Sequence, residues 1–144
     1  MPSEEKLVLR PVSKPQNETE DELVRWFCKA FGLEEELEPV ILKEIISKSI
    51  SGEGTTSKEL YEKIKIPRST VIYHLNRFID SGLIVRKGRK YYLRSMSLEE
   101  TIAELQQDML REFSKLMEFA EKFDEMITRE LYGRGRQESK RKTR

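Results

Sequence analysis

The chain has 144 residues, of which 37% are hydrophobic and 37% are charged. This length fits one domain or a small domain with extensions, and so polar a composition favours long helices and small modules over the thick core of a large enzyme. The sequence contains no apolar run of the roughly 20 residues that span a bilayer, and its N-terminus lacks an apolar signal segment. The single cysteine, Cys28, has no partner for an internal disulfide, which is consistent with a reducing compartment. We therefore expect a cytoplasmic protein with no membrane contact.

The net charge of +1 conceals an uneven distribution along the chain. Residues 52–95 have a net charge of +6 and residues 133–144 of +5, whereas residues 1–51 and 96–132 have −4 and −6. Positive charge collected in a central segment and a tail is typical of a nucleic-acid-binding face. Ordinary unevenness of surface charge is the alternative, and only the motifs can separate the two.

Residues 1–33 are predicted to be an N-terminal extension with one amphipathic helix. The helix should begin near Thr19, before acidic residues that favour the positive end of its dipole, and end near Gly32. Large apolar residues, including Trp26 and Phe27, recur in it at helical spacing. This pattern predicts packing, either within the same chain or across a dimer.

Residues 34–95 predict three helices followed by a β-hairpin. The first helix should start close to Pro39, and the capping-box sequence Thr56-Ser57-Lys58-Glu59 opens the second. The turn that joins the second and third helices, Lys65-Ile66, is so short that the two helices must cross steeply. This order is typical of a helix-turn-helix.

The third helix follows Pro67 and ends near Gly82. If Val71, Leu75 and Phe78 face the core, the opposite side presents polar and basic residues to solvent: Arg68, Ser69, Thr70, Tyr73, Asn76 and Arg77. Such side chains bond to base edges and phosphates, and the major groove of B-DNA accepts one helix. After Gly82, two short β-rich runs flank Lys87-Gly88-Arg89 and predict a hairpin.

The segment TSKELYEKIKIPRSTVIYHLNRFIDSGLIVRKGRKYYL resembles the DNA-binding core of ArsR-like winged-helix transcriptional regulators, particularly small archaeal ones. The resemblance covers about residues 37–94 and is strongest over residues 69–84. It implies a recognition helix in the major groove and a wing tip over an adjacent minor groove or its phosphates. It matches His74 to the family's His-Leu pair, where packing is expected. The DNA-binding residues that it implies are Arg68, Ser69, Thr70, Tyr73, Arg77, Arg86, Lys87, Arg89 and Lys90.

The sequence departs from the metal-sensing members of that family. Those members use clusters of Cys, His and carboxylates, whereas this chain has only Cys28 and His74, on different predicted faces. We therefore expect no metal and no other cofactor. The chain also has no phosphate-binding glycine loop and no nucleophile elbow, so we expect no enzymatic activity.

Residues 96–132 are predicted to form one long helix, opened by a second capping box at Ser97-Leu98-Glu99-Glu100. A helix about 50 Å long cannot bury its apolar face on a domain of about 60 residues, so a second chain is expected to cover it. Folding back onto the N-terminal helices of the same chain is the alternative. Residues 133–144 are predicted to be a basic disordered tail. The predicted dimerisation residues are Leu98, Ile102, Leu105, Met109, Phe113, Leu116 and Phe123.

The expected fold is therefore mainly α with a small β-hairpin: a winged helix-turn-helix domain flanked by an N-terminal helix and a long C-terminal dimerisation helix. The expected function is that of a transcriptional regulator that binds double-stranded DNA sequence-specifically as a homodimer. The alternative is a winged-helix protein-interaction module that recruits a partner in a transcription assembly without reading DNA. Recruitment of a basal transcription factor by the helix with Trp26 and Phe27 is compatible with both.

Overall fold

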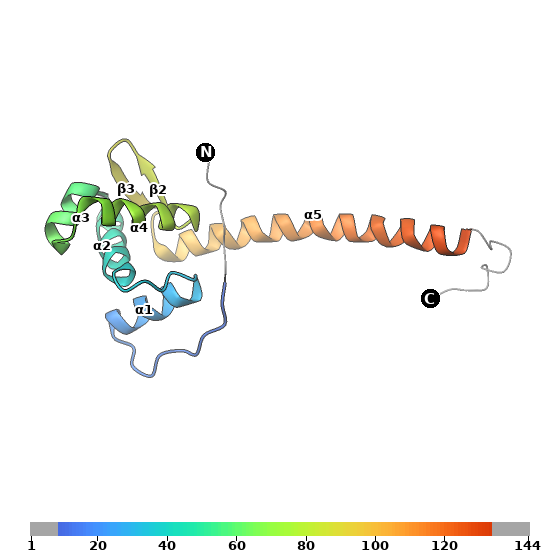
Figure 1. The fold of residues 1–144 in the computed structure, drawn as a ribbon, viewed down its shortest axis with the longest axis horizontal. Helices are drawn as coiled ribbons and strands as arrows, with labels where there is room; N and C mark the ends of the chain where they lie inside the picture. Colours follow the sequence, from blue (N-terminus) through green and yellow to red (C-terminus); the bar gives the residue numbers. More distant parts are fainter. Residues whose placement is uncertain (1–8, 134–144) are drawn as a thin grey trace. The chain divides into compact units, whose positions relative to one another are not determined.

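The computed structural model describes residues 9–133 and is mostly helical, with a small antiparallel sheet. The chain divides into a unit that extends to Leu105 and a second unit from Gln106 onward. The first unit contains all the elements of the winged helix-turn-helix, and Figure 1 shows its elements in chain order. Within residues 9–133, no helix is long and apolar enough to cross a membrane. The predicted basic tail lies outside the described residues, apart from Gly133.

The N-terminal helix α1 (Glu20–Ala30) packs in its own chain. Thr19 caps it as expected, because its hydroxyl accepts a hydrogen bond from the backbone N–H of Glu22 at 3.2 Å. Cys28 and the residues just after the helix, Phe31 and Leu33, are buried in the core of the first unit. The sequence left open whether this helix packs in its own chain or on a second one, and the structure shows that it belongs to its own core.

Three helices then form the helix-turn-helix and its support: α2 (Glu38–Ile50), α3 (Ser57–Ile64) and α4 (Arg68–Asp80). The capping box at the start of α3 is confirmed, since Thr56 and Glu59 exchange both of its hydrogen bonds. The turn between α3 and α4 depends on Lys65, which adopts the left-handed conformation (φ 64°) and donates its N–H to the Tyr61 carbonyl. Residues Ile41, Leu42, Ile45, Leu60, Val71, Leu75 and Phe78 from these helices form the centre of the core.

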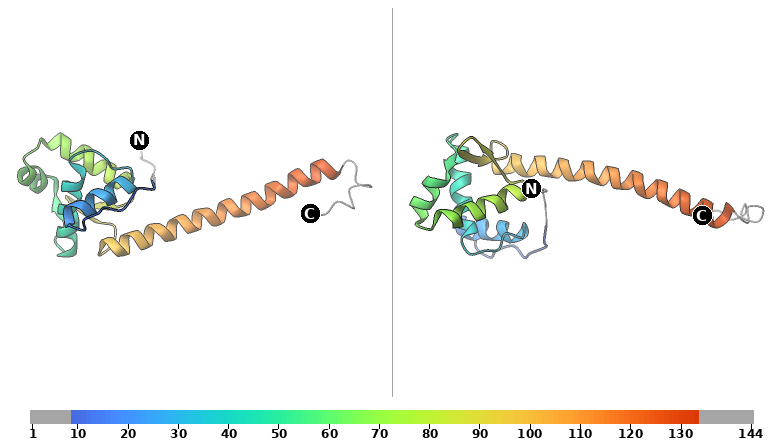
Figure 2. Two further views of the ribbon diagram at one scale, coloured as in Figure 1. Left: turned by 90° about the horizontal axis from the view of Figure 1, so that it is seen from below. Right: turned by 45° about the horizontal axis from the view of Figure 1, so that its top comes forward.

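The predicted hairpin is confirmed as strands β2 (Ile84–Lys87) and β3 (Lys90–Leu93). Gly88 alone supplies the positive φ, 65°, at the first loop position, which is the pattern of a type II′ turn. A third strand that the sequence did not reveal, β1 (Thr55–Thr56), pairs with β3 to give the order β1-β3-β2. Figures 1 and 2 show the hairpin on the opposite side of the first unit from α1.

The long helix α5 (Leu98–Gly133) begins in the first unit. Only half of the second capping box forms: the Glu100 N–H donates to the Ser97 hydroxyl, but the Glu100 carboxylate accepts from Ser95. Leu98, Ile102 and Leu105, which the sequence assigned to the dimer interface, pack against the core of their own chain. Leu105 lies so close to Gly82 that a Cβ atom at position 82 would be 2.9 Å from its side chain. The first two turns of α5 therefore belong to the winged unit.

From Gln106 onward, α5 is described by itself. One face carries ion pairs between neighbouring turns, such as those of Lys115 with Glu112 and of Arg129 with Glu125. The other face is apolar and exposed to solvent in this single chain, with Leu110, Phe113, Leu116, Met117, Phe119, Phe123, Met126 and Leu131 on it.

Candidate nucleic-acid interface

The helix α4 has one face in the core and one in solvent, as the sequence predicted. Val71, Leu75 and Phe78 are fully buried, so the backbone of the helix cannot rotate without emptying the core. On the opposite face, Arg68, Ser69 and Asn76 are exposed and Thr70 is half-buried. Tyr73 has 49% of its surface exposed. The structure thus gathers four of the five predicted contact residues of α4 at its N-terminal half and on its solvent side.

A buried carboxylate fixes the other end of this helix. Glu38, the first residue of α2, is fully buried and accepts hydrogen bonds from Arg77 Nε at 2.5 Å and Arg77 Nη2 at 3.3 Å. The same carboxylate lies 2.9 Å from His74 Nδ1. Hydrogen bonding to Glu38 raises the pKa of Arg77 above its ordinary value. The cluster ties the start of α2 to the middle of α4, and so sets the direction in which α4 presents its exposed side.

This cluster gives Arg77 a structural role that the sequence did not reveal. Its guanidinium also lies 3.6 Å from Glu35 and 5.9 Å from the centre of the Tyr73 ring. The contact of Arg77 with phosphate stays a prediction. His74 is buried, in line with the packing role expected for it.

Tyr73 is held by an acidic neighbour. Its hydroxyl donates to the Glu35 carboxylate at 2.6 Å, and this hydrogen bond raises the pKa of Tyr73. Glu35 and Glu38 lie 38 and 36 residues away in sequence from Tyr73 and His74, so no local spacing could have indicated these contacts. A run of four acidic residues in five, at 34–38, is the only sequence signal at this place.

The wing carries the four predicted cations, but the pleat of the strands divides them. Arg86 lies opposite Tyr91, and its guanidinium is 5.5 Å from the ring centre of that tyrosine. Lys87 lies directly opposite Lys90, on the other face of the hairpin. Arg89 occupies the second position of the turn and is exposed. The cations therefore surround the tip of the hairpin and do not form one flat patch.

The pair Lys87 and Lys90 is unfavourable in the isolated chain, because like charges directly opposite each other destabilise a sheet. Its partial compensation comes from two contacts: Lys90 donates to the Glu53 carbonyl at 2.9 Å, and the Lys87 ammonium lies 5.5 Å from the Tyr92 ring centre. An anion at the tip would relieve the repulsion further.

Two further exposed lysines lie beside the helix-turn-helix and were not among the predicted contacts. Lys58 is in the first turn of α3, and Lys65 is in the turn before α4. Both belong to the segment of net charge +6, which was the only sequence signal for them.

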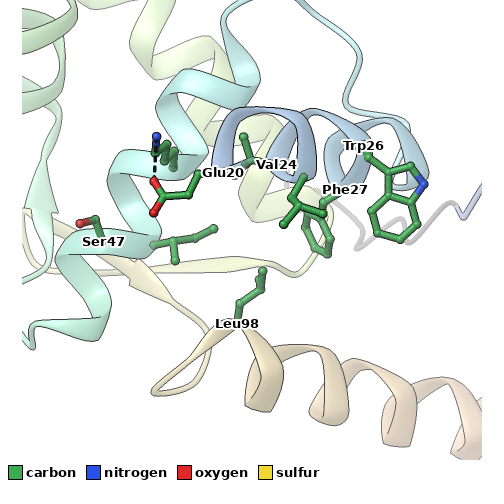
Figure 3. A pocket seen from close by; sticks show the side chains of 9 residues that line it. Glu20, Val24, Trp26, Phe27, Ser47 and Leu98 are labelled. Atoms are coloured by element: carbon green, nitrogen blue, oxygen red, sulfur yellow. Dashed lines mark ion pairs between the residues drawn. The ribbon is translucent and has the colours of Figure 1, made fainter. Parts of the chain in front are cut away.

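A separate apolar groove of about 470 Å³ lies between α1, α2 and the start of α5 (Figure 3). Phe27 and Leu98 line its interior, and Trp26 lines one end. Lys43 lies at its edge, where hydrogen bonds to Asp21 and Glu20 raise its pKa. Trp26 and Phe27 also serve their own chain: the Trp26 indole donates to the Val12 carbonyl at 3.5 Å, and the Phe27 ring lies 4.7 Å from that of Phe31.

No group of three or more His, Cys, Asp or Glu residues within residues 9–133 is arranged to hold a metal ion. The Cys28 thiol is buried, and its pKa is raised to about 12 by burial first and by the charge of Glu38 second. A thiol with so high a pKa is a poor nucleophile and a poor metal ligand at neutral pH.

Comparison with known proteins agrees with this geometry. Residues 41–85 match the family model for winged helix-turn-helix DNA-binding domains. The match begins within α2 and ends within β2, so it includes the whole helix-turn-helix. No curated protein sequence and no solved structure matches the chain.

Proposed function

The chain contains a winged helix-turn-helix DNA-binding domain, in a fold that is otherwise helical. We propose that it is a sequence-specific regulator of transcription that binds double-stranded DNA as a homodimer, with α4 in the major groove and the wing against the backbone or an adjacent minor groove. The observation that carries this proposal is the exposed polar side of α4, with Arg68, Ser69 and Tyr73, on a helix whose opposite side is locked into the core. The resemblance to ArsR-like regulators, particularly archaeal ones, supports the same proposal.

The two parts of this surface would have different tasks. Cations at the tip of a wing bond to phosphates, which every sequence presents alike, and so contribute affinity. Hydroxyl and guanidinium groups on α4 can reach base edges, where sequences differ, and so contribute specificity. The opposed lysines of the wing are consistent with this division, because binding of phosphate would remove their mutual repulsion.

Salt dependence tests the task of the wing. Changing Arg86, Lys87, Arg89 and Lys90 together to Ala should weaken binding to specific and random duplexes alike. Because each phosphate contact contributes about 0.9 to the slope of log K against log salt, four lost contacts should reduce that slope by up to about 3.6. The matched control changes Lys115 and Lys122, on the polar face of α5, to Ala and should leave the slope unchanged. An unaltered slope in the wing variant would refute the assignment.

Base selection tests the task of α4. The variant Ser69→Ala with Tyr73→Phe should change which duplexes are selected from a random pool, with a smaller effect on binding to random DNA. Tyr73→Phe also breaks the hydrogen bond to Glu35, so Glu35→Gln is the control that perturbs this bond and keeps the tyrosine. The same change in selection by both variants would mean that Tyr73 acts by its position and not by contact with a base.

The protein-interaction module remains the competing function, and the apolar groove beside α1 is the observation that favours it. A mobility-shift experiment on random duplex at low salt separates the two. Binding that weakens steeply as salt rises supports the DNA-binding regulator, and absence of binding supports the module.

A further inference from the structure

The second unit of the chain, α5 from Gln106 onward, has an apolar face with no cover in the single chain. Phe113, Leu116 and Phe123 have 56%, 59% and 48% of their surface exposed. A soluble protein rarely leaves so continuous an apolar face in water, so a partner is expected on it. The proposed function requires only that this partner be a second copy, and the order of residues along the helix specifies more.

The apolar residues of this unit follow the seven-residue repeat of a coiled coil. With Phe113 at position a, the a positions are Gln106, Phe113, Ala120 and Ile127, and the d positions are Met109, Leu116, Phe123 and Glu130. The polar residues Gln106 and Glu130 therefore occupy the first and last layers, and apolar residues occupy the six between. Leu110, Met117, Phe119 and Met126 flank this seam and widen it.

A parallel pair in register would place every residue against its own copy. Glu130 would then face Glu130 of the partner subunit, which brings two negative charges together in the seam. Ala120 would face Ala120 of the partner subunit, which leaves a void between two methyl groups. Both layers count against the parallel arrangement.

An antiparallel pair places each a residue against a d residue. When Gln106 lies against the partner's Glu130, the layers that follow match Met109 with Ile127, Phe113 with Phe123, and Leu116 with Ala120. Large is set against small in the central layer, the two aromatic residues meet, and an amide donor meets a carboxylate at each end. No layer brings like charges together.

Neighbouring antiparallel registers fail. A shift by one heptad in one direction sets Phe123 against the partner's Gln106, and a shift in the other direction sets Phe113 against the partner's Glu130. Each shift places a polar side chain on an aromatic ring, at a cost of about 1–3 kcal/mol per unpaired polar group. Because both ends of the repeat are polar, one register is selected.

We propose that residues 106–130 of α5 pair with the same segment of a second copy in an antiparallel coiled coil, in the register that sets Gln106 against the partner's Glu130 and brings the two-fold axis level with Glu118. This inference rests on the proposed homodimer and specifies its geometry. The carboxylates at the two ends of the seam select the direction, and the Leu116 and Ala120 layer allows the helices to approach at the centre.

Disulfide trapping tests the register in the full-length chain. The test uses Gln106→Cys and Glu130→Cys, at two polar and exposed positions where a small side chain should not disturb folding. In the proposed register, position 106 of one chain meets position 130 of the other. Positions that bear the same number lie about 36 Å apart, at 1.5 Å per residue, far beyond disulfide reach. The native thiol should not compete, because Cys28 is buried.

Each single variant alone should form almost no covalent dimer under mild oxidation, whereas an equimolar mixture exchanged through mild denaturation should form the mixed dimer in high yield. Covalent dimers of each single variant with itself would show a parallel pair and overturn the proposal. The control pair Gln106→Cys with Phe123→Cys, which is the shifted register, should not cross-link.

Sedimentation of the unmodified chain separates the possible failures. A mass of two chains with cross-links in the parallel pattern refutes the register and leaves the proposed homodimer intact. A mass of one chain refutes both, and a mass of four chains refutes the two-stranded pair. Binding to random duplex, measured on the same samples, reports on the DNA-binding function independently of these outcomes.

Discussion

The buried cluster of Glu38, His74 and Arg77 offers the sharpest test of how α4 is held. Glu38→Gln keeps the volume of the side chain and its carbonyl acceptor but removes the charge that faces Arg77 Nε at 2.5 Å. Breaking a fully buried ion pair costs about 3–5 kcal/mol. Because 31% of the Arg77 side chain remains exposed and can be hydrated, we expect a smaller loss here, about 2 kcal/mol in the free energy of unfolding.

The matched control is Glu44→Gln, the same substitution on the same helix. Glu44 pairs with Lys63 at 2.9 Å, but 65% of the lysine side chain is exposed. Exposed pairs contribute at most about 1 kcal/mol, so this variant should lose much less stability than Glu38→Gln. The comparison cancels the effect of the substitution itself and isolates the effect of burial.

Urea denaturation followed by far-ultraviolet circular dichroism measures both losses. The protein concentration must be held constant, because the stability of a dimer depends on it. A double-mutant cycle of Glu38→Gln with Arg77→Met should give a coupling energy of at least about 1 kcal/mol, since the two side chains are in direct contact. If Glu38→Gln loses no more stability than Glu44→Gln, the carboxylate does not fix α4 and the reasoning is wrong.

Three further predictions concern single positions of the winged unit. Lys65→Gly should raise the free energy of unfolding by up to about 1 kcal/mol in urea, because glycine adopts the left-handed conformation of the turn without the steric cost that a lysine bears. Gly82→Ala should lower it by about 2 kcal/mol or more, because φ is 86° and the added methyl group would lie 2.9 Å from Leu105; an unchanged midpoint would contradict the packing of α5 on this turn. Cys28 should react with a thiol reagent in native protein at pH 8 far more slowly than in urea, since its pKa is about 12. A raised pKa adds stability below the pKa of the unfolded thiol, so stability should fall as the pH rises from about 9 towards 12, and this fall should be absent in Cys28→Ala.

The local patterns of the sequence were sufficient for the elements and their order. Apolar spacing of 3 and 4 located α4 and α5, the Thr56 and Glu59 capping box marked the start of α3, and the glycine between basic residues marked the hairpin turn. These features depend on residues within one or two turns of each other, and such interactions are formed by the chain locally. The exposed side of α4 followed from the same reasoning, because the residues that face the core identify those that do not.

Contacts between distant segments required the tertiary structure. Glu38 and Arg77 are 39 residues apart, and β1 is two residues long, too short to show a period of its own. Leu98, Ile102 and Leu105 were read as part of one uniform stripe, yet they pack on the core of their own chain. A helical pattern states which side of a helix is apolar but not what lies against it.

The sequence by itself thus determined which residues α4 and the wing present to solvent, and with them the DNA-binding character of the chain. Only the tertiary structure decided that α1 belongs to the winged unit, that Arg77 and Tyr73 are held by acidic neighbours, and where along α5 the intramolecular packing ends. The physical reason is range: periodicity and capping are set by neighbours in the chain, whereas burial and ion pairing are set by segments that only folding brings together.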